Sequence, residues 1–311
     1  MHEPSPAYMT VAPLTSGSVA DCAALWPDRN AYTNQEFAAA LRSCAQLFDE
    51  RRAIGARVHE NERLSAFGLS VFLQPDFADA YLAAPHPLLG KRLLLDPRPI
   101  AGFADIAAAN ASRGLCLCVL AANFDVTSPN AAAALGLCMQ ATLDMHRGYR
   151  IERFINEAVG DANIEFLATS GAFDFVRTFE TAAPGTALRS ALFTLTKERA
   201  AERKSTLLPL FVYNPPRVGF TPAEQDLLRA ALDAAPDDVI SARLGIPLSA
   251  TKARWTRIHQ RVAARLPEIR NAVPRPQDMT RRGPQLRHLV LAYVRDNPSE
   301  LTPCAKAHRA K

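Results

Sequence analysis

A stretch of helical periodicity, residues 221–266, constrains the fold of this chain more than any other feature of the sequence. Apolar residues recur there every three to four positions, which is typical of short amphipathic helices. Thr221 and Glu224 form a capping box at the first helix start, and Gly245 ends a second helix where a left-handed residue is needed. Ser249 is expected to cap a third helix. The pattern predicts a helix-turn-helix.

The predicted third helix combines an apolar stripe with cations on its other faces. Trp255, Ile258 and Val262 form the stripe. A helix of this kind can enter the major groove of DNA, where its first residues reach base edges while its cations contact phosphates. The candidate DNA-binding residues are Ser249, Thr251, Lys252, Arg254, Arg257 and Arg261.

Charge is distributed unevenly along the chain. From residue 251 onward there are fourteen Lys and Arg against four Asp and Glu, a net charge of +10, whereas all 311 residues together carry +5. Residues 1–250 therefore carry −5. A basic end on a mildly acidic body indicates a polyanionic partner, most simply double-stranded DNA. The alternative is a solvated basic tail.

The long segment 33–215 predicts a mixed α/β domain, of the α+β or α/β class. Residues 115–124 form a largely continuous apolar run, which favours a strand covered on both faces. A second strand is expected over 91–95, and helices are expected over 34–52 and 151–159. Residues 1–32, rich in Pro, Ala and Ser, are predicted to be a flexible N-terminus.

The C-terminal part divides further. Prolines and a glycine in 214–220 mark a boundary, so that 220–266 is a separate all-α domain. Residues 267–311 comprise a basic linker, a helix over 285–296 and a tail. This last helix is too apolar to stand alone in water, so it must fold back on the bundle or pair with a second subunit. A homodimer is the preferred prediction.

Residues 220–266 resemble the C-terminal helix-turn-helix of the LuxR/FixJ family of bacterial transcription regulators. The resemblance differs at Ser241, where the family has a small alanine, and at Ala250-Thr251, where it has Thr-Val. It implies a cytoplasmic DNA-binding regulator, not an enzyme, whose N-terminal domain senses a signal such as a small-molecule or acyl-CoA-like effector. The residues that match the family pattern are Phe220, Glu224, Ile240, Leu244, Ile246 and Lys252.

A second resemblance concerns residues 146–158 together with 166–173, which are similar to the acyl-CoA-binding region of GNAT-type acetyltransferases. In that family a glycine-containing loop opens a helix and offers backbone N–H groups to pyrophosphate. The resemblance implies Arg147, Gly148 and Arg150 as cofactor-binding candidates, although only one glycine is present. The alternative function is therefore a GNAT-like acyl-CoA-dependent acyltransferase with an accessory helical domain. A protein-interaction module is the third reading.

Other functional classes find little support in the sequence. There is no nucleophile-elbow, Walker-type or dinucleotide-binding motif, and the histidines and six cysteines show no metal-ligand spacing. No metal site and no resident cofactor are expected. The chain has no long apolar run and no secretory signal pattern, so no membrane association is expected and the predicted location is the cytoplasm.

Overall fold

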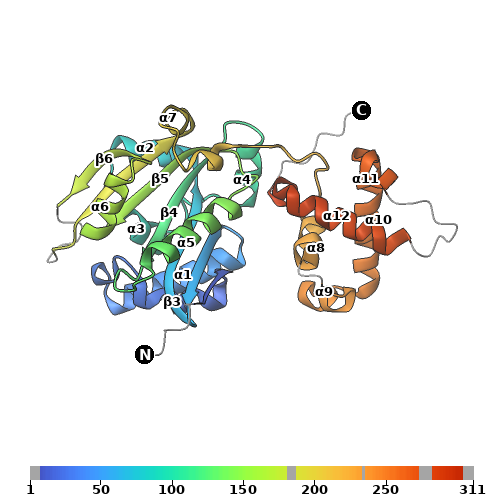
Figure 1. Cartoon of the computed structure of the whole chain (residues 1–311), viewed down its shortest axis with the longest axis horizontal. Helices are drawn as coiled ribbons and strands as arrows, with labels where there is room; N and C mark the ends of the chain where they lie inside the picture. The colour runs from blue at the N-terminus through green and yellow to red at the C-terminus, as the bar shows by residue number, and fades with distance from the viewer. Residues whose placement is uncertain (1–7, 181–186, 233–234, 273–281, 304–311) are drawn as a thin grey trace, which may run out of the picture. The chain divides into compact units, whose positions relative to one another are not determined.

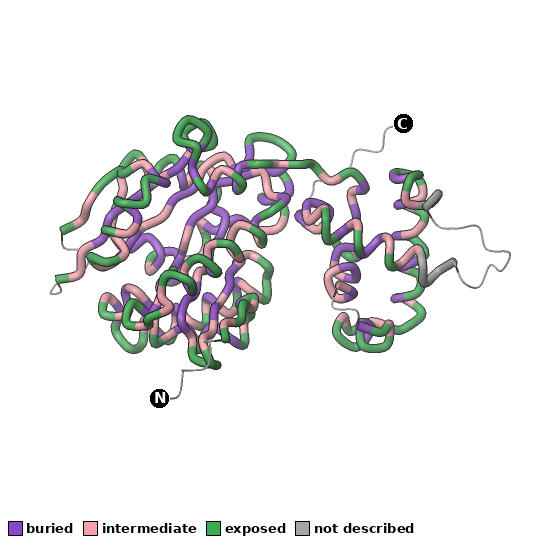
Figure 2. The backbone as a smooth tube through the Cα atoms, viewed as in Figure 1, coloured by how far each residue is buried: buried purple, intermediate pink, exposed green. Residues whose placement is uncertain are grey.

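The protein divides into two compact units, Met1–Val212 and Tyr213–Lys311. The computed structural model describes residues 8–180, 187–232, 235–272 and 282–303. Each unit has its own hydrophobic core, and buried backbone runs through the centre of each in Figure 2. The arrangement within each unit is shown in Figure 1.

A seven-stranded mixed sheet forms the centre of the first unit. Its spatial order is β1-β2-β3-β4-β5-β7-β6, and all neighbours are antiparallel except β4 and β5, which run parallel. With helices on both faces, this sheet confirms the predicted mixed α/β fold class. The strands are β1 (Met9–Pro13), β2 (Ala53–Glu60), β3 (Arg63–Leu73), β4 (Leu115–Phe124), β5 (Ile151–Val159), β6 (Asp174–Phe179) and β7 (Ser190–Thr196).

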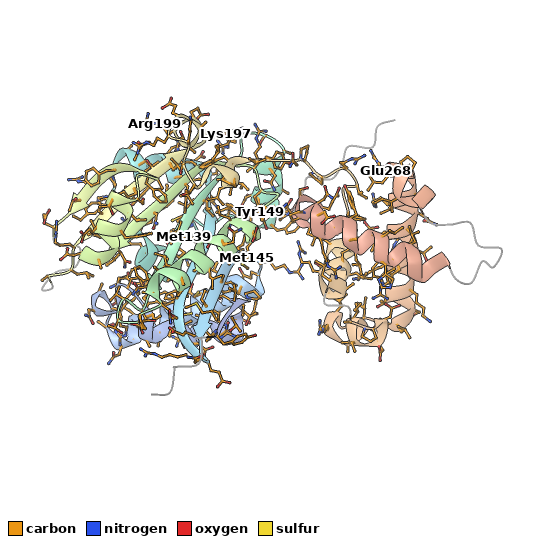
Figure 3. The ribbon with its side chains drawn as sticks, in the orientation of Figure 1. Met139, Met145, Tyr149, Lys197, Arg199 and Glu268 are labelled. Carbon is orange, nitrogen blue, oxygen red and sulfur yellow. The ribbon has the colours of Figure 1, made fainter. Side chains whose placement is uncertain are left out.

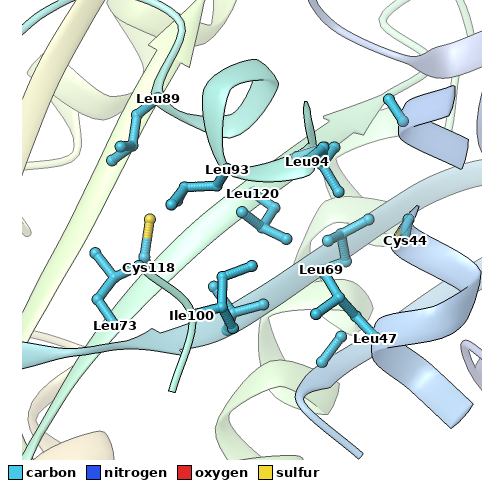
Figure 4. Close-up of a cluster of buried hydrophobic side chains, with 14 of the residues drawn as sticks. Cys44, Leu47, Leu69, Leu73, Leu89, Leu93, Leu94, Ile100, Cys118 and Leu120 are labelled. Carbon is cyan, nitrogen blue, oxygen red and sulfur yellow. The ribbon is translucent and has the colours of Figure 1, made fainter. Parts of the chain in front are cut away.

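Helices pack on the two faces of the sheet, and the two main apolar clusters of this unit lie between the helices and the sheet, one on each face. Figure 4 shows part of the first cluster, with Leu47, Leu93 and Leu120 among its labelled side chains. One face carries η1 (Ser16–Leu25), α1 (Asn34–Asp49), α2 (Pro75–Ala83) and α3 (Leu89–Leu95). The other carries α4 (Phe103–Asn110), α5 (Ala131–Met145), α6 (Asp161–Thr169), α7 (Lys197–Glu202) and η3 (Leu208–Phe211), and η2 (Arg29–Ala31) precedes α1.

Three sequence predictions in this unit are wrong. Residues 91–95 belong to the helix α3 and not to a strand, and residues 151–159 form the strand β5 and not a helix. The stretch from residue 8 to residue 32 is not flexible, because it holds β1, η1 and η2 and buries Trp26 in the core. Residues 1–7 lie outside the described part of the chain.

The second unit is a bundle of helices. Its core includes Phe220, Leu228, Trp255 and Val290. The apolar side of the last long helix is buried in this core, so the helix folds back on its own bundle. The elements are α8 (Pro222–Leu232), α9 (Asp237–Leu244), α10 (Leu248–Arg265), α11 (Pro267–Ala272), α12 (Arg282–Asp296) and η5 (Pro298–Leu301). Across both units, none of the described helices has the length and apolarity that spanning a bilayer requires.

Candidate functional site

The sheet opens between its two parallel strands. β4 and β5 pair only from Leu115 with Ile151 to Cys118 with Ile155. Beyond that point β4 continues to pair with β3, and β5 continues to pair with β7. The facing edges of the two strands are therefore left without a strand partner along the second half of their length, and the opening forms a passage through the sheet.

A bulge and a close helix contact accompany the opening. Leu69 of β3 pairs with Ala121 while Ser70 pairs with Val119, so Leu120 is an extra residue in β4. Such a bulge bends a strand and increases its twist. Gly90 of α3 lies directly against it, since a Cβ added there would be 2.1 Å from the Leu120 carbonyl oxygen. Only a glycine lets the helix approach this closely.

The opening contains a cavity of about 180 Å³, which is lined from both faces of the sheet. Its apolar side is formed by helix and loop side chains, among them Met139 and Met145, which Figure 3 labels on α5. Further apolar lining comes from Leu135, Cys138, Phe154, Ala158, Phe166, Leu167, Phe173, Leu207 and Leu210. Its polar lining includes Asp28, Ser70, Asn123, His146, Asn156, Glu157 and Asn163.

Glu157, half-buried on β5, has its carboxylate occupied by three donors. The backbone N–H of Leu88 donates to Oε1 at 2.7 Å, that of Leu89 donates to Oε2 at 2.6 Å, and the Ser190 hydroxyl donates to Oε1 at 2.6 Å. Burial raises the pKa of Glu157, and these three donors oppose the rise. The contacts tie the start of α3 to β5 and hold Leu88 in a left-handed conformation with φ of 60°. Glu157 thus anchors one wall of the cavity.

Asp28 is the second carboxylate of the cavity, and it is 5% exposed. Within the described residues no cationic side chain forms an ion pair with it. Burial raises the pKa of Asp28 to about 7, and the charge of Glu157 adds to the rise, while the nearby Trp26 indole and Lys91 ammonium act in the opposite direction. A carboxyl group with a pKa near neutrality can both accept and release a proton at physiological pH.

Two further polar atoms near Asp28 are buried, the indole Nε1 of Trp26 and the hydroxyl of Tyr32, and neither has a hydrogen-bond partner of good geometry among the described residues, although the indole lowers the pKa of both Asp28 and Tyr32. Asp28 contributes to the raised pKa of Tyr32, after the larger effect of burial. Lys91 does not satisfy these groups, because its Nζ donates to the Ala31 carbonyl at 2.6 Å and to the Glu36 carboxylate at 3.1 Å. Buried polar groups without partners are rare and call for a physical explanation.

Ser70 and His146 form a satisfied pair in the same cavity. The His146 Nδ1 lies 2.7 Å from the Thr142 carbonyl, which can only accept, so Nδ1 carries the proton and Nε2 accepts from the Ser70 hydroxyl at 2.8 Å. Burial lowers the pKa of His146 to about 4, against a smaller raising effect of Thr142. An imidazole this weakly basic is a poor general base at neutral pH. The pair is a structural link between β3 and the end of α5.

The residues implied by the acetyltransferase resemblance lie in a different setting from the predicted one. Arg147, Gly148 and Arg150 occupy the turn between α5 and β5, and a strand follows them where a helix was expected. No helix N-terminus is therefore available for pyrophosphate at this loop. Gly148 is buried with φ of 90°, and Arg150 forms an ion pair with Glu152 at 3.1 Å.

The six candidate DNA-binding residues all lie on α10 but do not share one surface. Thr251 is fully buried, and its hydroxyl lies 2.8 Å from that of Ser241, so it faces α9 and cannot contact a ligand. Arg261 pairs with Glu224 at 3.1 Å. Arg254 is half-buried, whereas Ser249, Lys252 and Arg257 are exposed. The N-cap of α10 is Pro247, so the prediction that Ser249 caps this helix is wrong.

Comparisons with known proteins bear on the first unit. No family model matches the chain, and no curated protein matches it. Among solved structures, it is similar to an agmatine N-acetyltransferase mutant, at 11% identity over 60% of this chain and 99% of that one, with a TM-score of 0.37. It is also similar to FeeM, an N-acyl amino acid synthase from uncultured soil microbes, at 13% identity over 66% and 99%, with a TM-score of 0.37. The ribosomal-protein-S18-alanine N-acetyltransferase from Escherichia coli matches at 11% identity over 61% and 94%, with a TM-score of 0.36.

At these identities the likeness concerns the fold alone. The matched structures are those of acyltransferases, so the prediction that the chain is not an enzyme finds no support in them. The predicted LuxR-type, DNA-binding transcription regulator also finds no support in these matches. Among the residues that the structure describes, no cluster of His, Cys, Asp and Glu could hold a metal ion.

Proposed function

We propose that the first unit transfers an acyl group from a thioester, such as an acyl-CoA, to an acceptor amine. The observation that carries this proposal is the divergence of β4 and β5 beyond Cys118 and Ile155. An extended ligand with amide groups can pair with the two free strand edges, as peptides do when they add to an open sheet. The thioester carbonyl then lies where the passage meets the carboxylates, and the acyl chain enters the apolar side.

The lining of the cavity favours an acyl chain of several carbons over an acetyl group. The cavity has a volume of about 180 Å³. Met139, Phe166 and Leu210 belong to its apolar side. Each methylene transferred into such a site contributes about 0.8 kcal/mol. Affinity is therefore expected to rise from acetyl-CoA to hexanoyl-CoA and to stop rising once the cavity is full.

A single substitution tests this placement. Ala158 is buried on β5 and lines the cavity, so Ala158→Leu should fill part of the space that the acyl chain needs. Overfilling a packed site costs about 1–3 kcal/mol, which corresponds to about five- to 150-fold weaker binding of hexanoyl-CoA. Isothermal titration calorimetry of the full chain measures this affinity.

The matched control is Ala132→Leu, the same change at an exposed position of α5. This variant should bind hexanoyl-CoA as the wild type does. If the wild type binds no acyl-CoA, or if both variants bind equally well, the proposed donor site is wrong.

A further inference from the structure

Two carboxylates line the cavity, and they differ in their hydrogen-bond partners. Glu157 accepts three hydrogen bonds, which link β5 to α3 and β7, so its lone pairs are engaged. Asp28 is more deeply buried, yet among the described residues it forms no ion pair, and the side chain that acts on it by hydrogen bonding is the neutral Trp26 indole. A buried carboxylate without a cationic partner is costly, and that cost falls if a ligand brings a cation.

The surroundings of Asp28 make a ligand the natural partner. The ammonium group of Lys91, which acts on Asp28, already donates to the Glu36 carboxylate and to the Ala31 carbonyl. The hydroxyl of Tyr32 is also buried, and it has no hydrogen-bond acceptor among the described residues. A protonated amine offers three N–H donors to a carboxylate and a hydroxyl.

We infer that Asp28 is the acceptor-binding and proton-accepting residue of the proposed reaction, and that the acceptor enters the cavity as a protonated alkylamine. This inference rests on the proposed acyl transfer and adds the acceptor class and the base. Glu157 is a positioning residue, because it holds the start of α3 and places a negative charge beside Asp28.

The chemistry balances without any further reactant. The Asp28 carboxylate takes one proton from the ammonium and leaves a neutral amine. The amine nitrogen attacks the thioester carbonyl, a C–N bond forms and the C–S bond breaks. The second proton from nitrogen passes to the departing thiolate, which gives an amide and a thiol. Asp28 then releases its proton to water, and the cycle can repeat.

The titration of Asp28 should be visible in turnover. The charged and titratable groups that act on it are Glu157 from β5, Lys91 from α3 and the phenol of Tyr32. With both substrates saturating, kcat should rise with pH around 7, because the carboxylate must be ionised to accept the proton. Removing the Glu157 charge with Glu157→Gln should shift that rise to lower pH, an effect that a purely structural role would not produce.

The decisive experiment compares Asp28→Asn with Asp21→Asn, a matched change at an exposed residue of η1. Transfer from hexanoyl-CoA to a primary alkylamine should fall about 100-fold or more in Asp28→Asn, as expected for loss of a general base, and remain unchanged in Asp21→Asn. Hexanoyl-CoA affinity should be unchanged in both. Aniline, which is already unprotonated at neutral pH, should show a much smaller defect, and Asp28→Glu should restore part of the alkylamine rate.

The outcomes separate this inference from the function on which it rests. A wild type that binds no hexanoyl-CoA and transfers nothing overturns both. If hexanoyl-CoA binds and Asp28→Asn acylates the alkylamine at the wild-type rate, the role of Asp28 is wrong while acyl transfer stands. Equal losses with aniline and with the alkylamine also contradict proton removal by Asp28.

Discussion

The two units each bury a carboxylate, and the contrast between Glu300 and Asp28 separates a structural acid from a reactive one. Glu300 of the second unit is fully buried and accepts from the backbone N–H groups of Arg217, Val218 and Gly219 and from the Tyr293 hydroxyl at 2.8 Å. Asp28 of the first unit is nearly as buried, but within the described residues it pairs with no cation, and burial raises its pKa to about 7. A buried carboxylate whose oxygens all accept hydrogen bonds serves as a structural link. A buried carboxylate with fewer hydrogen bonds remains available for chemistry.

The largest effect is expected at Glu300. Glu300→Ala leaves three backbone N–H groups and one phenol without their acceptor, and each unsatisfied buried donor costs about 1–3 kcal/mol. We expect the free energy of unfolding of the second unit to fall by about 5 kcal/mol. The chain has two tryptophans, Trp26 in the first unit and Trp255 in the second, so urea titration of a Trp26→Phe background follows the second unit alone.

If Glu300→Ala unfolds at the same urea concentration as the Trp26→Phe parent, Glu300 is not the structural carboxylate described here. The control is Glu268→Ala, which removes an exposed carboxylate of the same unit that pairs with the Arg217 guanidinium. An exposed pair of this kind contributes at most about 1 kcal/mol.

Asp28 should show the opposite behaviour. Its pKa is raised from 3.8 to about 7, so folding favours the protonated acid. The stabilisation is fully present below pH 4 and is lost as pH rises through 7, by about 4 kcal/mol at 1.36 kcal/mol per pKa unit. Asp28→Asn should lack this loss and be more stable than the wild type at pH 8, when urea unfolding is followed by Trp26 in a Trp255→Phe background. Equal slopes against pH in both proteins would contradict the account.

The smallest effect is expected at Ser70. Ser70→Ala removes the hydroxyl that donates to His146 and leaves one buried nitrogen unpaired, at a cost of about 1–3 kcal/mol. Acyl transfer measured at saturating substrates should remain within about twofold of the wild type, because this pair is structural. A loss of turnover comparable to that of Asp28→Asn would show that the wrong polar pair has been assigned to the chemistry.

Much of the fold follows from local pattern. The apolar run 115–124 forms a central strand, as predicted, because its side chains enter the clusters on both faces of the sheet. The helix predicted over 34–52 appears as α1, whose buried residues Phe37, Ala40, Cys44 and Leu47 follow helical spacing. Gly245 ends α9 in a left-handed conformation with φ of 60°, as expected.

β5 shows why pattern is insufficient for the site. Its buried residues Ile151, Phe154, Ile155, Ala158 and Val159 recur at helical spacing, yet the segment is a strand. Ile155 packs on one face of the sheet and Phe154 on the other, so burial on both sides removes the alternation that identifies a strand. Tertiary pairing with β4 and β7 overrides local periodicity.

The candidate site was missed for a related reason. Asp28 lies in a Pro- and Ala-rich stretch, and its neighbours along the chain give no sign of reactivity. Its properties come from burial and from Glu157, a residue distant in sequence that the fold brings close. In the second unit the pattern predicted the helices, but Thr251, expected at a ligand surface, is bonded to Ser241 inside the bundle.

The most direct test of the account mixes the full chain with hexanoyl-CoA and a primary alkylamine and quantifies products by mass spectrometry. The account predicts N-hexanoyl amide and free CoA thiol in equal amounts, formed only when both substrates are present. An absence of amide, or thiol accompanied only by free hexanoic acid, would contradict it.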